Sequence, residues 1–220
     1  MGVLRRVVED VRWSTNEVPE PQGCALSHVN DQDRRKAEWR TFQRVDAAFR
    51  AGDLDALRAA IPDQAMLPDG WIPAIGRFLE YAIYHSPLPF IRTLLEMGAD
   101  PNPSDHSGFP PLIAALACTR AAPGSTPRDD VDRVIRLLLE FGADPNQRGV
   151  NDYTPLHMAV AEGNAPAVQI LLDAGADPDV RTRIDDCETP LEMARKIDRS
   201  DMVGVLERMA GRRTARGGRA

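Results

Sequence analysis

The chain has 220 residues, of which 43% are hydrophobic and 27% charged, and its formal net charge at pH 7 is −6. This composition argues against wholesale disorder and against a membrane protein, and the length is sufficient for a sizeable core. The longest nearly apolar stretch, PPLIAALAC, is far shorter than the ~20 residues that a membrane span needs. An acidic chain also argues against general binding to the phosphate backbone of nucleic acids.

Cysteine content and the N-terminus both bear on the compartment. The three cysteines, Cys24, Cys118 and Cys187, are widely spaced and odd in number, which predicts reduced thiols and no disulfide. No apolar signal segment follows the N-terminal arginines. We therefore expect a cytoplasmic protein. Arginine supplies 25 of the 27 basic residues, which suggests a GC-rich, bacterial genome.

The N-terminal region offers little local pattern. Residues 1–29 match nothing and are treated as an unassigned arm. From about Asn30 the spacing of Ala37, Phe42 and Val45 predicts a helix that continues into VDAAFRAGDLDALRAAI, a segment with the spacing of a helix pair. Trp13, Trp39 and Trp71 lie in and around this region. We expect them to pack the N-terminal region onto the helices that follow rather than to bind a cofactor.

Two short strings recur together along the rest of the chain. GADPN occurs at 98–102 and 142–146 and GADPD at 175–179, at intervals of 44 and 33 residues. Pro-Leu, preceded by Thr in the last two cases, then opens a helix-like segment at 111, 155 and 190. Two linked markers at a period near 33 indicate a repeat array. The longer interval predicts an eleven-residue insertion within TRAAPGSTPRDD (119–130), whose Pro, Gly and Ser favour a mobile surface loop.

The best-preserved unit spans 152–179 and predicts a pair of short helices. Thr154 is a natural N-cap, and Pro155 suits the first helical position, where a missing N–H costs nothing. Gly163 ends this helix, and a second helix with an apolar stripe ends at Gly175. Each helix is apolar on one side, so the pair must stack on neighbouring pairs to remove those stripes from water.

This unit resembles the ankyrin repeat, through TPLHMAVAEGN, VQILLDAGADP and the 33-residue step. Extending the alignment outward gives about five repeats over residues 30–210, with a divergent first and last repeat. The resemblance implies an all-α solenoid of stacked helix pairs with hairpin loops, an N-terminal extension, and an inserted loop in the third repeat. Residues 211–220, GRRTARGGRA, are predicted to form a basic, disordered tail.

Candidate chemical groups are few. The resemblance implies that His157 is structural and bonds near its own turn. Cys24 and His28 form a single pair without the second pair that a zinc site needs. The run Asp185–Cys187 fits a solvated loop better than a converging active site, and no glycine-rich phosphate loop is present. We expect no catalytic residue, no metal site and no cofactor.

In ankyrin arrays, hairpin tips and the first helix of each repeat line a concave groove that binds partners. Phe109 and Tyr153 occupy the same repeat position here, so we expect them to lie side by side as an aromatic anchor; packing between hairpins is the open alternative. Carried over position by position, the groove consists of Gly76, Tyr84, His85, His106, Ser107, Phe109, Ala117, Cys118, Val150, Asn151, Tyr153, Ala161, Glu162, Glu188, Lys196 and Ile197.

The resemblance thus implies a non-enzymatic protein, monomeric on its own, that masks, inhibits or scaffolds one protein partner as an adaptor, inhibitor or immunity-type protein. The alternative is an enzymatic or nucleic-acid-associated factor that acts through the N-terminal arm or the arginine-rich tail. No catalytic motif supports an enzyme, and the tail has no aromatic residue among its arginines for stacking on bases.

Overall fold

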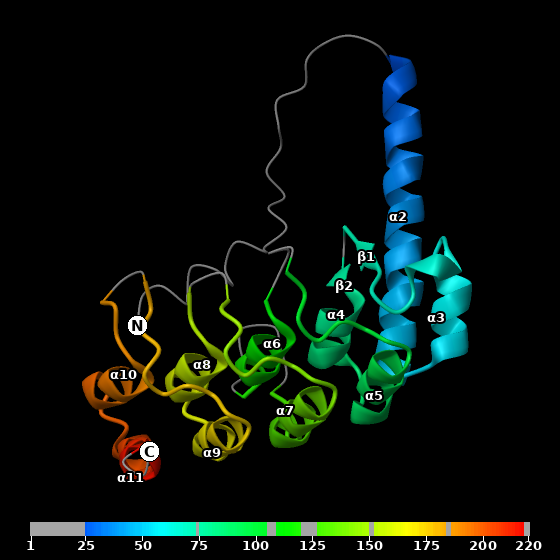
Figure 1. Cartoon of the computed structure of the whole chain (residues 1–220). Helices are drawn as coiled ribbons and strands as arrows, with labels where there is room; N and C mark the ends of the chain where they lie inside the picture. The colour runs from blue at the N-terminus through cyan, green and yellow to red at the C-terminus, as the bar shows by residue number, and fades with distance from the viewer. Residues whose placement is uncertain are drawn as a thin grey trace.

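The structure, a computed structural model, describes residues 25–73, 75–104, 109–119, 127–149, 152–183 and 186–217. Helices stack in successive pairs along one direction, which confirms the predicted all-α repeat solenoid (Figure 1). The pairs are α2 (Ala25–Ala51) with α3 (Leu54–Ala60), α4 (Phe78–His85) with α5 (Leu88–Glu96), α6 (Pro111–Ala117) with α7 (Val131–Glu140), α8 (Pro155–Glu162) with α9 (Ala165–Asp173), and α10 (Pro190–Lys196) with α11 (Ser200–Gly217).

Helix α8 shows why the repeat sequence folds as predicted. The Thr154 hydroxyl accepts a hydrogen bond from the His157 N–H, and Pro155 occupies the first turn. Gly163 ends α8 with φ 77°, a left-handed conformation that suits glycine, and the Asn164 side chain then caps α9. Leu156 of α8 and its apolar counterparts in the other pairs form one continuous buried cluster. Burial at about 25 cal/mol per Å² of apolar surface makes this cluster the main stabilising contribution.

The asparagine of each GADPN string links one repeat to the next. Asn102 donates from Nδ2 to the Gly142 carbonyl at 2.8 Å and accepts from the Asp144 N–H at 2.6 Å. Asn146 makes the same two bonds one repeat further on, at 3.4 and 2.7 Å. These side chains satisfy backbone groups at the ends of α7 and α9, so they fix the spacing of adjacent hairpins.

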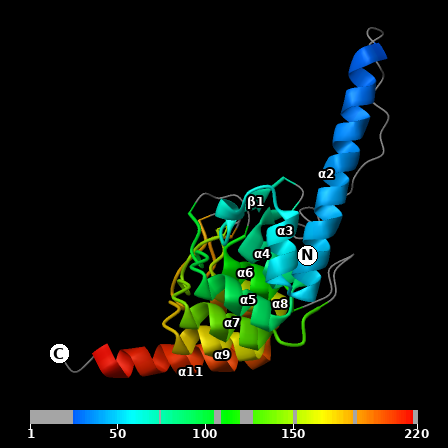
Figure 2. The ribbon, with the colours of Figure 1, turned by 90° about the vertical axis from the view of Figure 1, so that its right-hand side faces the viewer.

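Helix α2 begins at Ala25, before the predicted start near Asn30, and only its C-terminal part packs on the solenoid. Val45 and Phe49 are fully buried, whereas residues 32–40 are all exposed. Figures 1 and 2 both show α2 projecting away from the repeats. A 3₁₀ helix, η1 (Gln64–Met66), and an antiparallel pair of short strands, β1 (Trp71–Ile72) and β2 (Gly76–Arg77), then connect α3 to α4.

Two of the tryptophans do not pack as predicted. Trp39 is 57% exposed and Trp71 is 50% exposed, so neither fastens the N-terminal region to the repeats. The physical reason is position: Trp39 lies on α2 before that helix reaches its packing partners, and Trp71 lies on the strand pair. Phe49 of α2 makes this contact instead: its ring packs edge-on against Phe78 and Tyr81 of α4 and Phe90 of α5. Trp13 lies outside the described residues.

The C-terminal segment and the insertion also differ from their surroundings. Helix α11 continues to Gly217, so residues 211–217 are helical where a disordered tail is predicted. Buried Met202 and Leu206 anchor the start of α11, and the Arg and Ala that follow favour helix. The insertion falls between α6 and α7, as predicted, and residues 120–126 lie outside the described part. None of the described helices is long and apolar enough to span a membrane.

Candidate functional site

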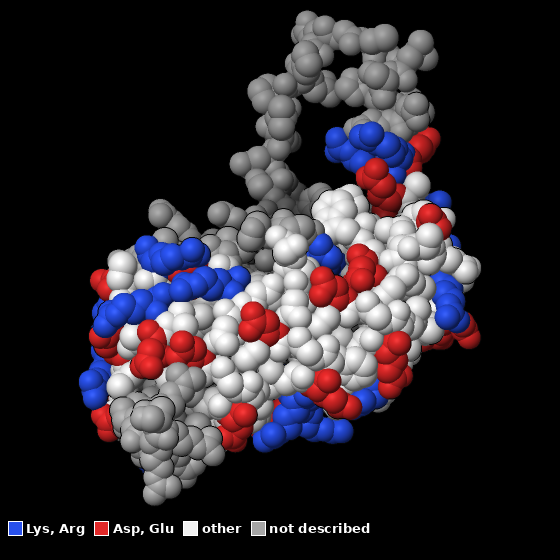
Figure 3. All heavy atoms as spheres, viewed as in Figure 1, with Lys and Arg blue, Asp and Glu red and all other residues white. Residues whose placement is uncertain are grey.

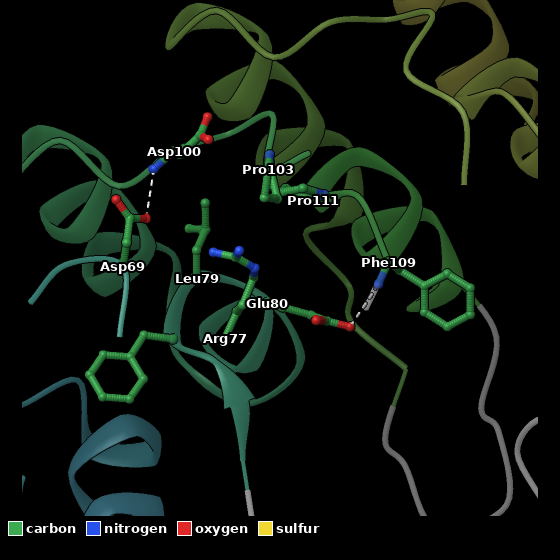
Figure 4. Close-up of a pocket in the computed structure, with 9 residues that line it drawn as sticks. Asp69, Arg77, Leu79, Glu80, Asp100, Pro103, Phe109 and Pro111 are labelled. Atoms are coloured by element: carbon green, nitrogen blue, oxygen red, sulfur yellow. Dashed lines mark hydrogen bonds between the residues drawn. The ribbon is translucent and has the colours of Figure 1, made fainter. Parts of the chain in front are cut away.

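Glu80 on α4 organises the first part of the predicted groove. Its Oε1 accepts a hydrogen bond of 3.2 Å from the backbone N–H of Phe109, which lies just before α6. Burial raises the pKa of Glu80, and the Phe109 N–H and Arg77 oppose this shift. Figure 4 shows the ring of Phe109 pointing away from Glu80. The backbone of Phe109 is therefore held in place while its half-buried ring is directed elsewhere.

A small hollow lies beside this hydrogen bond. It is lined by Asp69, Arg77, Phe78, Leu79, Glu80, Asp100, Pro103, Phe109 and Pro111 (Figure 4). Asp69 is already engaged there, because its carboxylate accepts a 2.8 Å bond from the Asp100 N–H. The hollow has room for little more than a water molecule, so it can position loops but cannot hold a cofactor.

Tyr84 lies near Glu80 as well, and Cys118 lies near Tyr84. Burial raises the pKa of Tyr84, and the nearby Glu80 and Cys118 add to this shift. Cys118 is buried, its thiol donates to the Ala114 carbonyl at 3.3 Å, and burial raises its pKa to about 11. The thiol therefore stays protonated at neutral pH and is a poor nucleophile. Two predicted groove residues thus contact or neighbour Glu80, a carboxylate that the sequence analysis missed: Phe109 through its backbone N–H, and Tyr84 on the same helix. Cys118 lies at the other end of α6 from Phe109.

His85 lies on the side of α4 that faces α2. The centroid of its ring is 4.3 Å from that of Tyr81. The Tyr81 hydroxyl donates to the Asp46 carboxylate of α2 at 2.5 Å. Burial lowers the pKa of His85, and the neighbouring Arg50 of α2 lowers it further. This histidine therefore contributes to the contact between α2 and α4.

Tyr153 and His157 form the second part of the groove. Their rings stack with centroids 5.7 Å apart. His157 is fully buried; its Nδ1 lies 2.8 Å from the Thr154 hydroxyl, and its Nε2 lies 3.0 Å from the Glu188 carbonyl of the next repeat. Burial lowers the pKa of His157, which favours the neutral ring. The structural role that the resemblance implies for His157 is confirmed, and it extends to linking two repeats.

The last groove residues lie around α10. Lys196 forms ion pairs with Asp186 and with Glu188, the latter at 2.9 Å, and these partners raise its pKa, Asp186 most. Ile197 is 43% exposed, and Glu162 at the end of α8 is half-buried. Ala117 and Ala161 are also half-buried, at or near the ends of α6 and α8. Gly76 lies in β2, and the other predicted groove residues, His106, Ser107, Val150 and Asn151, lie outside the described residues.

Asp152 stands at a turn position where the resemblance to ankyrin repeats implies glycine. It has φ 63°, in the left-handed region where the pattern has glycine. Its buried carboxylate accepts bonds from the Arg183 N–H and guanidinium, and from Arg148 Nη1 at 2.6 Å. Hydrogen bonding to Arg183 is the main reason that the pKa of Asp152 is lowered. The strain of the left-handed residue is thus offset by an ion network that joins two hairpins.

Arg128 anchors the end of the insertion. Its guanidinium donates to the Ile83 and Ser86 carbonyls at the C-terminal end of α4, at 3.0 and 2.6 Å, and pairs with Asp130 at 2.8 Å. Its backbone N–H donates to the Cys118 carbonyl, which closes the base of the loop. A cation here satisfies helix-end carbonyls that have no partner within α4. Neither Arg128 nor Asp152 has a local sequence signal for its role, because their key partners lie more than 30 residues away.

Across the described ranges, no group of three or more His, Cys, Asp or Glu side chains is arranged to hold a metal ion.

The sequence matches the family model for ankyrin repeats (three copies) over residues 79–182 and, in an overlapping match, 119–206. A comparison with curated proteins found no match. The family match begins at α4, so the assignment of α2 and α3 as the first of five repeats stays a prediction. Ankyrin repeats are in general protein-interaction modules, and both the match and the stacked helix pairs show that the chain belongs to the ankyrin repeat family.

Proposed function

We propose that the chain is a non-enzymatic protein that holds one protein partner in its groove, as an adaptor, inhibitor or immunity-type protein. We further propose that it is monomeric without its partner and acts in the cytoplasm, where the free thiols of Cys118 and Cys187 stay reduced. The observation that supports binding best is the placement of Phe109 and Tyr153, each half-buried and each just before the first helix of its repeat.

Both aromatic residues are held in place before any partner arrives. The Glu80 carboxylate fixes the backbone of Phe109, and the buried ring of His157 supports that of Tyr153. A fixed side chain loses little conformational entropy on binding, and an aromatic ring can bury a large apolar area in a partner. The proposed contact surface therefore centres on these two rings, with Tyr84 beside Phe109 and Glu188 and Lys196 at the far end.

The test has two steps. Affinity purification of the tagged chain from its native cell, followed by mass spectrometry, identifies the partner. Isothermal titration calorimetry then compares the wild-type chain with the Phe109→Ala/Tyr153→Ala variant. We expect the double substitution to cost about 2 kcal/mol or more of binding free energy, because central aromatic residues dominate interface energetics.

Arg136→Ala on α7 and Gln169→Ala on α9 are matched controls, because both side chains are exposed on the second helices. Their affinities should remain near that of the wild type. If the aromatic variant binds normally but has a much lower melting temperature, the two rings only stabilise the hairpins, and the proposed groove is wrong.

A further inference from the structure

The exposed half of α2 is a surface that the groove does not use. It precedes the residues that match the repeat family, and residues 32–40 are exposed on every side. Trp39 stacks on Phe42 there, with ring centroids 5.2 Å apart and an angle of 27° between the planes. More than half of Trp39 is in contact with water. A large, exposed apolar side chain on a projecting helix is a feature typical of binding surfaces.

Basic residues surround this aromatic pair. Between residues 33 and 44 the helix has five basic side chains and two acidic ones, whereas the whole chain has a net charge of −6. The basic residues are Arg34, Arg35, Lys36, Arg40 and Arg44. Figure 3 shows basic side chains gathered on α2 away from the repeats. The exposed half of α2 is therefore positive on an otherwise acidic molecule.

Helical spacing divides these charges between two faces. Arg35 and Lys36 precede Trp39 by four and three positions, so they lie on the same face as Trp39. Arg40 follows Lys36 by four positions and lies at the edge of this face, about 100° from Trp39, whereas Arg44 lies about 140° from Trp39 and on the opposite side of the helix from Arg35. Lys36 pairs with Asp33 at 3.8 Å, but both side chains are largely exposed, and such a pair costs little to exchange.

We propose that this face of α2, defined by Arg35, Lys36, Trp39 and Phe42, docks an acidic helical segment of a protein partner. A straight, convex helix is best matched by a second helix lying along it, with apolar side chains against the aromatic pair. Carboxylates beside that apolar stripe would pair with Arg35 and Lys36. This surface is separate from the groove and does not depend on the aromatic anchor proposed there.

Other occupants fit less well. One face of the Trp39 ring already lies on Phe42, which leaves less room for a nucleic acid base to stack, and the acidic body repels a polyanion. A second copy that docked through the same face would place one basic face against another, which is unfavourable. An acidic amphipathic segment meets both the apolar and the charged requirement.

The experiment uses the full chain and a fluorescein-labelled amphipathic helical peptide with leucines on one face and flanking glutamates. Fluorescence anisotropy should show saturable binding that weakens with added salt. Trp39→Ala should weaken it at least ~10-fold, as for an anchor residue. Arg35→Glu should weaken it at least as much, whereas the equally charged change Arg44→Glu should alter it less than ~3-fold because Arg44 lies on the opposite side of the helix.

Further controls separate this proposal from its alternatives. Trp71→Ala and Phe109→Ala/Tyr153→Ala should bind the peptide as the wild type does, because neither change touches α2. The proposal fails if the peptide does not saturate the chain, if a lysine version binds equally well, or if the two charge-reversed variants weaken binding equally. Tighter binding of duplex DNA, lost in the Trp39→Ala variant, would assign the face to nucleic acid instead.

Two remaining outcomes would assign the face to this chain itself. Sedimentation velocity over a wide range of concentration would reveal self-association that Trp39→Ala abolishes, if a second copy were the occupant. If the N-terminal arm covered the face, Leu4→Asp would increase the affinity of the peptide several-fold. Either result would overturn docking of a partner.

Discussion

Two neighbouring helix pairs, α6 with α7 and α8 with α9, occupy equivalent places in the solenoid but are built differently. Helix α8 starts with the Thr154 cap and buried His157, whereas α6 starts after Pro110 without a side-chain cap and has buried Ile113 where α8 has His157. Gly163 alone separates α8 from the residue that caps α9. The link between α6 and α7 includes the insertion.

This difference shows what the repeat needs. At the position directly after the Pro-Leu pair, occupied by Ile113 in α6 and His157 in α8, either an apolar side chain or a fully hydrogen-bonded polar one is sufficient. The reason is that a buried polar group costs free energy only when it lacks a hydrogen-bond partner. Between the helices, a long loop is acceptable when its base is closed again. Arg128 closes it, through α4 of the preceding pair.

The largest effect should come from His157→Ala. The substitution leaves a cavity and removes one of the two hydrogen-bond partners of the Glu188 carbonyl, so we expect a loss of about 3 kcal/mol in the free energy of unfolding. Urea denaturation followed by circular dichroism measures it. His157→Ile should be less damaging, because an apolar side chain of similar size fills this position in α6. Stability within about 0.5 kcal/mol of wild type for His157→Ala would show that the linking role is wrong.

A smaller loss, about 2 kcal/mol, is expected for Arg128→Ala, because its charged donors satisfy two carbonyls of α4 and its side chain is only 11% exposed. Thermal unfolding of this variant and of Arg133→Ala, an exposed arginine on α7, provides the comparison. Replacing residues 120–126 by a short flexible linker should change stability much less, since loop length has a weak effect. If all three variants lost the same amount of stability, Arg128 would not be the residue that anchors the insertion.

Much of the fold could be predicted because its signals are local. The GAD strings, the Thr-Pro start of α8 and the 33-residue step fix the helix pairs and the location of the insertion. The expectation that the whole of 119–130 is a mobile surface loop is wrong for Arg128, which is held against the end of α4, and for Asp130, which pairs with Arg128. Arg128 reaches back to carbonyls 42 and 45 residues earlier, a contact that no local pattern contains.

The candidate site was predictable in outline only. Repeat alignment assigned Tyr84, Phe109 and Cys118 to one groove, but Glu80, whose carboxylate accepts from the Phe109 N–H, gave no signal because a helical glutamate is normally solvated. The alignment also predicted that Phe109 and Tyr153 lie side by side, yet it could not show that each is supported by a different buried group. The same limit applies to Trp39, whose exposure depends on where α2 leaves the solenoid.

The smallest effect concerns pH and has opposite signs in the two parts of the groove. Glu80 has a raised pKa in the folded chain, so its contribution to stability is complete below its ordinary value of 4.5 and is lost as pH rises through the folded value. His157 has a lowered pKa, so its contribution is complete above its ordinary value of 6.5 and is lost as pH falls towards the folded value. Relative to Glu80→Gln, the wild type should therefore lose stability with rising pH. Relative to His157→Ile, it should lose stability with falling pH.

Differences between variants isolate these two contributions, because His85, whose pKa is also lowered, remains in every chain and cancels. Asp152 interacts with His157, but its pKa is lowered from the ordinary value of 3.8, so it is mainly ionised over the range measured. Urea denaturation from about pH 4 to about pH 8 gives the free energy of unfolding for each variant, and its slope against pH reports the difference in bound protons. Glutamine keeps the carbonyl oxygen that accepts from the Phe109 N–H, so the Glu80→Gln comparison isolates the titration. Slopes of the same sign in both comparisons would mean that burial does not shift the pKa values of Glu80 and His157 in opposite directions relative to their charge. The roles of Glu80 and His157 in holding Phe109 and Tyr153 would then be wrong.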